Sequence, residues 1–93
     1  MIRHVYLFKL KDPSRRREAA EKLLTLKERV PEIAHIEVGL DFKGAENSYD
    51  LCECVSFKNR EDFLAFGENA YHAEIRAYMA SVQEDGVKID YEI

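Results

Sequence analysis

The sequence predicts an α+β domain of the ferredoxin-like βαββαβ type, with a four-stranded antiparallel sheet. Four segments have the composition or the two-residue period of strands, and two helical regions separate them in the order strand, helix, strand, strand, helix, strand. The 93 residues suffice for one modest core. We therefore expect a single domain over residues 1–93.

The first strand is expected over residues 2–10, where only Arg3, His4 and Lys9 interrupt an apolar run. Side chains alternate along a strand, so Val5 and Leu7 share one face. The opposite face carries Ile2, His4, Tyr6, Phe8 and Leu10. A strand that is apolar on both faces is typical of the centre of a sheet.

A helix should follow, because Asp12 can cap it and Pro13 suits its first turn. Its apolar stripe has helical spacing and consists of Ala19, Leu23, Leu26 and Val30. Pro31 should end it. Strands over residues 35–42 and 49–57, joined by a turn at residues 44–48, are then expected to form an antiparallel hairpin.

Asn59 is the expected cap of the next helix, which should break at Gly67 and resume over residues 71–82. The expected buried side of its first part is Phe63, Leu64 and Phe66. Asp85 and Gly86 should form a turn before a closing strand over residues 87–93.

Two helices of this size cover only one face of such a sheet. The other face carries apolar residues, including Val5 and Leu7, and needs a partner. We therefore expect a homodimer in which two sheets face each other as a dimeric α/β barrel.

Composition excludes several classes of function. The net charge of −4, without a basic stripe, argues against a nucleic-acid partner. No apolar run is long enough to span a membrane, and Met1 leads directly into a strand rather than a signal peptide, so we expect a cytoplasmic protein. Cys52 and Cys54 lie two apart on one strand face, a geometry that disfavours a disulfide, and no second ligand pair suggests a metal.

His4 is the first candidate for chemistry, because its imidazole shares an apolar strand face with Tyr6 and Phe8. A histidine in this position is also typical of a core residue whose ring nitrogens are bound by neighbours. The aromatic residues, in turn, are typical of plain core as well as of a ligand pocket. The residues leave these alternatives open.

Five stretches together resemble the stress-responsive α/β-barrel (Dabb) family along nearly the whole chain: IRHVYLFKLKD, VPEIAHIEVGLDF, YDLCECVSFKNREDF, FGENAYHAEI and VKIDYEI. The resemblance implies a homodimer with a cavity in each subunit between sheet and helices. One plant member of the family is a polyketide cyclase that uses a first-strand His, a helix Tyr and a second His, without a cofactor.

By position, the two histidines of the resemblance fall on His4 and His72, which would be catalytic. The tyrosine falls on Phe66, which lacks the hydroxyl, so we do not expect cyclisation of the plant substrate. The other residues assigned to substrate binding are Tyr6, Phe8, Phe66 and Tyr71.

Three functions follow as hypotheses. The chain is a cofactor-free isomerase, lyase or cyclase in which His72 takes a proton from carbon while His4 or Tyr6 steadies the enolate oxygen. Alternatively, it binds a small hydrophobic or polyketide-like molecule without changing it, or it is a structural, stress-protective homodimer with a filled core.

Overall fold

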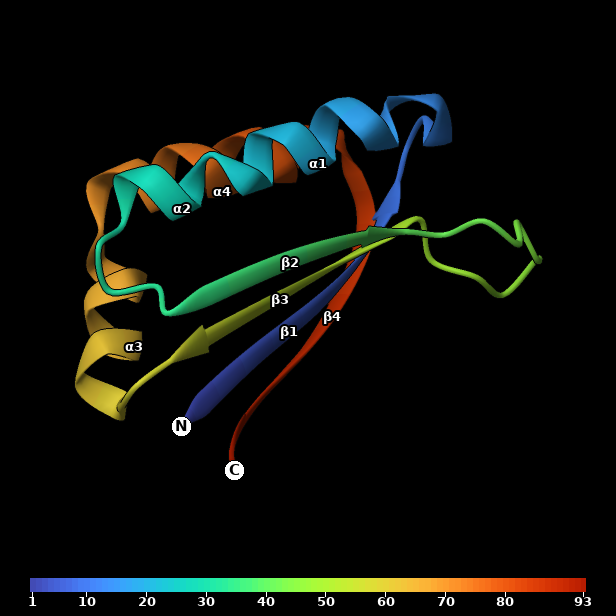
Figure 1. The fold of residues 1–93 in the computed structure, drawn as a ribbon. Helices are drawn as coiled ribbons and strands as arrows, with labels where there is room; N and C mark the ends of the chain where they lie inside the picture. Colours follow the sequence, from blue (N-terminus) through green and yellow to red (C-terminus); the bar gives the residue numbers. More distant parts are fainter.

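The computed structural model describes all residues, Met1–Ile93. One antiparallel sheet has the strand order β2-β3-β1-β4, and the helices lie against one of its faces (Figure 1). The strands are β1 (Ile2–Leu10), β2 (His35–Leu40), β3 (Leu51–Phe57) and β4 (Gln83–Glu92). The helices are α1 (Arg16–Leu24), α2 (Leu26–Arg29), α3 (Arg60–Glu68) and α4 (Ala70–Val82), with a 3-10 turn over Pro13–Arg15. The predicted ferredoxin-like fold is confirmed.

β1 lies inside the sheet, antiparallel to both β3 and β4. We call the sheet face against the helices the inner face and the opposite one the outer face. Along β1 the inner face carries Ile2, His4, Tyr6, Phe8 and Leu10, of which all but Tyr6 are buried. The two faces of β1 therefore divide as the alternation predicts.

The first helical region matches its sequence signals closely. The backbone N–H of Ser14 donates to the Asp12 side chain over 3.0 Å, and Pro13 opens the turn before α1. The helical path ends with Val30 in an extended conformation, directly before Pro31. The predicted stripe is fully buried: Ala19, Leu23, Leu26 and Val30.

The predicted break at Gly67 is wrong. α3 continues through Gly67 to Glu68, and the chain turns at Asn69, whose extended backbone ends one helix and starts the next. The Asn69 side chain accepts a hydrogen bond from the His72 backbone N–H over 3.0 Å. A glycine only weakens a helix, whereas a capping asparagine satisfies one of the free amides in the first turn of a new one. Leu64, expected on the buried side, is 61% exposed.

The predicted turn at Asp85 and Gly86 is also wrong, because β4 begins at Gln83 and contains both residues. Gly86 instead permits the ring of Tyr6 to lie close to the backbone of β4. A Cβ atom there would lie 2.5 Å from the ring of Tyr6, so any side chain would displace that ring. The second strand is shorter than expected: β2 stops at Leu40, and Phe42 lies beyond it, almost fully exposed.

The outer face carries an apolar band over β1 and β4. Val5 pairs with Ile89, and Leu7 pairs with Val87. Val87 and Ile89 are both exposed. No helix covers this face of the sheet (Figure 1). Cys52 and Cys54 lie on the same face as free thiols and are partly exposed. A contiguous exposed apolar surface of this kind is typical of an interface.

We predict that Ile89→Glu converts a dimer into a monomer. Ile89 is 59% exposed in the single chain, so the charge should disrupt association rather than folding. Sedimentation at micromolar concentration should give twice the 10.8 kDa chain mass for the native protein and the single chain mass for the variant. Leu24→Glu is the control, because Leu24 is an exposed apolar residue on α1. A native protein that sediments as a monomer contradicts the predicted interface.

Candidate functional site

A cavity of about 700 Å³ lies between the inner face and the helices α3 and α4. Half of its lining residues are hydrophobic, and several titratable side chains interrupt them. The lining includes two histidines, two carboxylates and two aromatic rings: His4, His72, Glu53, Asp90, Tyr6 and Phe66. Pockets of this size and mixed lining are typical of sites for small molecules.

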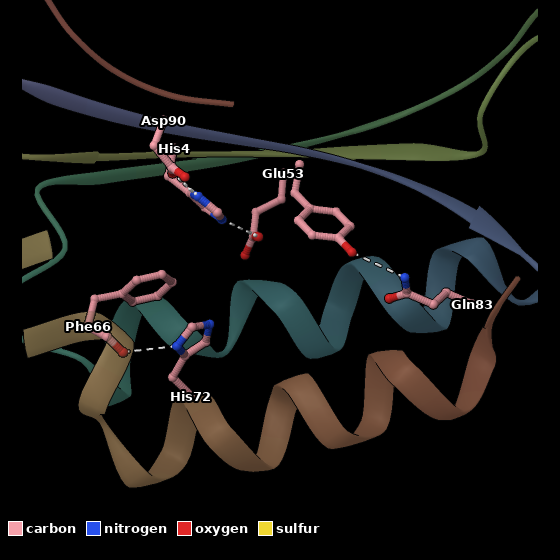
Figure 2. Close-up of polar contacts among 7 residues, drawn as sticks. His4, Glu53, Phe66, His72, Gln83 and Asp90 are labelled. Atoms are coloured by element: carbon pink, nitrogen blue, oxygen red, sulfur yellow. Dashed lines mark hydrogen bonds and ion pairs between the residues drawn. The ribbon is translucent and has the colours of Figure 1, made fainter. Parts of the chain in front are cut away.

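The sheet register brings three of the polar residues together. His4 pairs with Asp90 on β4, and Tyr6 pairs with Glu53 on β3. Residues paired across antiparallel strands point to the same face. The inner face of the sheet therefore presents one imidazole between two carboxylates (Figure 2).

Both ring nitrogens of His4 are engaged. Nδ1 is hydrogen-bonded to Oδ1 of Asp90, and Nε2 lies 3.6 Å from Oε1 of Glu53. Burial alone would lower the pKa of His4, but the hydrogen bonds and negative charges of Glu53 and Asp90 outweigh it and raise the pKa above the ordinary value of 6.5. The charged form of His4 is thus favoured.

Glu53 is the most deeply buried acidic residue, with 3% of its surface exposed. One carboxylate oxygen faces His4, whereas Oε2 is buried without a hydrogen-bond partner. Figure 2 shows this carboxylate directed from the sheet towards the helices, into the space that the cavity occupies. Buried polar atoms are almost always paired, so an unpaired carboxylate oxygen marks an unusual position.

His72 occupies the first turn of α4, where Asn69 caps the helix. Its Nδ1 lies 2.9 Å from the carbonyl oxygen of Phe66, which can only accept, so Nδ1 carries a proton. Burial lowers the pKa of His72 below 6.5, although the bond to Phe66 opposes this shift. The neutral ring consequently leaves Nε2 as a free base, and Figure 2 shows the ring directed from α4 towards the sheet.

Phe66 lies between the two histidines. Its ring stacks on His72 with centroids 3.8 Å apart, and its centroid lies 5.9 Å from that of His4. The phenyl ring supplies apolar surface but no hydrogen-bonding group at this point of the cavity.

Tyr6 supplies a hydroxyl group on the inner face. Its oxygen accepts a hydrogen bond from the Gln83 side-chain amide over 3.2 Å. The ring stacks on Phe8 with centroids 4.3 Å apart, and the backbone of Gly86 lies against it. Because Gln83 is the donor in this bond, the phenolic proton of Tyr6 remains available to an oxygen atom in the cavity.

Five of the six residues assigned from the sequence line this cavity, and the sixth does not. His4, His72, Tyr6, Phe8 and Phe66 all belong to its wall. Tyr71 lies outside it, because successive helical residues point in different directions. Its hydroxyl is hydrogen-bonded to that of Thr25 over 2.6 Å, and its ring lies 4.1 Å from the guanidinium of Arg29.

The sequence reasoning missed Glu53 and Asp90. A signal existed for Glu53, since it stands where the alternation of Leu51, Val55 and Phe57 calls for an apolar residue. Asp90 gave no such signal. It belongs to the polar side of β4, which an isolated strand pattern assigns to solvent but which the register turns towards the inner face.

Two observations concern metals and membranes. No group of three or more His, Cys, Asp and Glu side chains is arranged to hold a metal ion. None of the helices has the length and apolar character needed to cross a bilayer.

The model of the stress-responsive A/B barrel domain family, Dabb, matches residues 2–93. The chain belongs to the Dabb family. No curated protein matches this Dabb domain in sequence. The family resemblance of the sequence is thereby confirmed.

Several solved structures have the same fold as this Dabb domain. A dimeric ferredoxin-like protein of unknown function from Bacteroides fragilis is 24% identical, with a TM-score of 0.84 over 99% of this chain and 95% of that one. The hydroxynitrile lyase from Passiflora edulis is 18% identical, with a TM-score of 0.86 over 99% and 92%. HapK from Hahella chejuensis is 17% identical, with a TM-score of 0.77 over 100% and 92%. At these sequence identities, the likeness shows a shared fold and nothing further.

We predict that the two cavity histidines of this Dabb domain titrate on opposite sides of pH 6.5, with His4 above and His72 below. Proton NMR of the imidazole rings measures both values. Equal pKa values for the two rings contradict the assigned electrostatics.

We further predict a pH-dependent loss of stability in Asp90→Asn. Because the folded pKa of His4 is raised, its ion pairing stabilises the fold fully below about pH 6.5 and is lost as pH rises through the folded value. The variant should lower the free energy of unfolding by about 1–2 kcal/mol near pH 6 and by less near pH 9.

Urea unfolding at the two pH values provides the measurement. Glu92→Gln is the control, because Glu92 lies two residues further along β4 and forms an exposed ion pair with Arg60. That pair should contribute little at either pH. An Asp90→Asn effect that is the same at both pH values is inconsistent with a charged His4.

Proposed function

We propose that this Dabb domain binds a small, largely apolar carbonyl compound in the cavity and moves a proton on it without a cofactor. The observation that carries the proposal is the hydrogen bond of His72 Nδ1 to the Phe66 carbonyl, which leaves Nε2 without a partner in a half-apolar cavity, while burial lowers the pKa of the ring. Such a base can take a proton from a carbon next to a carbonyl group, and the substrate then delocalises the negative charge. Isomerisation, elimination by a lyase and aldol-type cyclisation can each begin with this step.

The carbonyl oxygen gains negative charge as the proton leaves, so it needs a hydrogen-bond donor. Tyr6 suits this role, since its oxygen already accepts from Gln83 and its proton is free. His4 is less suited to direct contact, because Asp90 and Glu53 engage both of its nitrogens. The pairing of His4 with these two carboxylates instead offsets part of their negative charge beside the developing enolate.

The structural relatives support an acid–base function only at the level of the fold. One of them is named a hydroxynitrile lyase, so this fold hosts at least one lyase. The dimeric relative from Bacteroides fragilis, together with the apolar outer face, supports a homodimer for this chain. In that arrangement the partners meet on the outer face, and each cavity stays within one chain.

One observation favours binding without turnover as a second candidate. The engagement of both His4 nitrogens is what a purely structural, hydrogen-bonded histidine would also show. In that case the cavity holds its ligand and His72 only positions it.

A carbon-acid probe separates the two candidates. The ring of 5-nitrobenzisoxazole opens when a base removes its carbon-bound proton: the proton passes to the base, the nitrogen–oxygen bond breaks and a coloured cyanophenolate forms. We predict turnover by the native protein that rises with pH through a pKa below 6.5 and then levels off. His72→Gln should reduce the rate by about a hundredfold or more.

His35→Gln is the matched control, because His35 is exposed at the start of β2, away from the cavity. Its rate should equal that of the native protein. A native rate that is unchanged by His72→Gln excludes His72 as the base. Saturable binding of the probe without turnover favours the binding candidate.

A further inference from the structure

We propose that Glu53 selects the ligand, by accepting a hydrogen bond at Oε2 from a neutral hydroxyl group, phenolic or enolic, at the sheet side of the cavity. This inference rests on the proposed function and specifies its substrate class. It gives a role to a residue that acid–base chemistry at His72 does not use.

The geometry of Glu53 carries the inference. Glu53 is only 3% exposed, and its Oε2 atom has no hydrogen-bond partner, although the side chain borders the cavity. An unpaired buried carboxylate oxygen is unfavourable by itself, because it has lost water without gaining a donor. A ligand that brings a donor to this oxygen removes that penalty when it binds.

The charges around Glu53 define which donor fits. The carboxylates of Glu53 and Asp90 outnumber the single imidazole between them and repel an anionic ligand. A cationic donor is disfavoured because it would lose its hydration in a cavity whose lining residues are half hydrophobic. A neutral hydroxyl group satisfies both conditions. The apolar half of the wall, including Phe66, Phe63 and Ile75, accommodates the hydrocarbon part of the same molecule.

The site also separates two ends of the ligand. Glu53 and His4 lie on the strands, whereas His72 lies on α4 on the other side of the cavity (Figure 2). A hydroxyl group bound to Glu53 therefore directs the remainder of the molecule towards Nε2 of His72. The favoured substrate carries a hydroxyl group and an acidic carbon in the same small, apolar molecule.

Two bicyclic probes test the selection. 2-Naphthol and 2-methoxynaphthalene share an aromatic body and an oxygen atom, but only the first can donate a hydrogen bond. Binding of each to the native protein is measured by fluorescence titration at neutral pH. We expect 2-naphthol to bind at least about tenfold more tightly, which is typical of a hydrogen bond to a charged acceptor.

Three variants assign the preference. Glu53→Leu removes the acceptor at similar volume and should bring the two affinities to within about twofold of each other. Glu53→Gln keeps a neutral acceptor and should give an intermediate preference, and it serves as the readout if the leucine variant does not fold. Glu68→Gln is the control, because Glu68 is an exposed carboxylate at the same cavity and should leave the preference unchanged.

The outcomes separate this inference from the proposed function. Equal binding of both probes to the native protein overturns the role of Glu53 and leaves a cavity that binds apolar molecules. A preference that persists in both Glu53 variants overturns it as well. If neither probe binds, the proposed function itself is wrong, and the inference is lost with it.

Discussion

β1 is paired along nearly its whole length on both edges, with β3 on one side and β4 on the other, and this double pairing determines both surfaces of the sheet. A strand held in this way cannot shift its register without moving every side chain to the opposite face. The inner side of β1 is therefore fixed as the floor of a cavity, and its outer side as an uncovered apolar surface. His4 and Tyr6 owe their orientation to this constraint rather than to local contacts.

The same register places the carboxylate of Glu53 on the buried inner face, where it needs a positive partner. Glu53 is buried among apolar residues, and a buried carboxylate without a counter-charge is strongly unfavourable. The imidazole of His4 supplies that counter-charge, and Asp90 on β4 holds the ring in place by a hydrogen bond to Nδ1. On the helix side, His72 forms no ion pair, and burial lowers the pKa of its ring. The pKa values of two histidines in one cavity are thus shifted in opposite directions by their different neighbours.

Much of the fold can be predicted from the sequence, because strand periods, the stripe from Ala19 to Val30 and the caps Asp12 and Asn59 are local signals. The errors occur where tertiary contacts override a local signal. Gly86 resembles a turn residue, yet it is a glycine because the ring of Tyr6 presses on its backbone. The histidines of the site could be proposed from their pattern and resemblance. Asp90 could not, because only the pairing of β4 with β1 places its side chain opposite His4.

The alternation of side chains along β1 separates changes to the outer surface from changes to the cavity. Odd-numbered positions such as Val5 and Leu7 belong to the outer surface, and even-numbered ones such as His4 and Tyr6 belong to the cavity. The two sets of side chains point to opposite faces of the same strand, so substitutions in one set leave the groups of the other in place. A substitution at an odd-numbered position can consequently alter the outer surface while the cavity is kept, and one at an even-numbered position can alter the cavity while the outer surface is kept. One short strand thereby provides two independent routes of divergence.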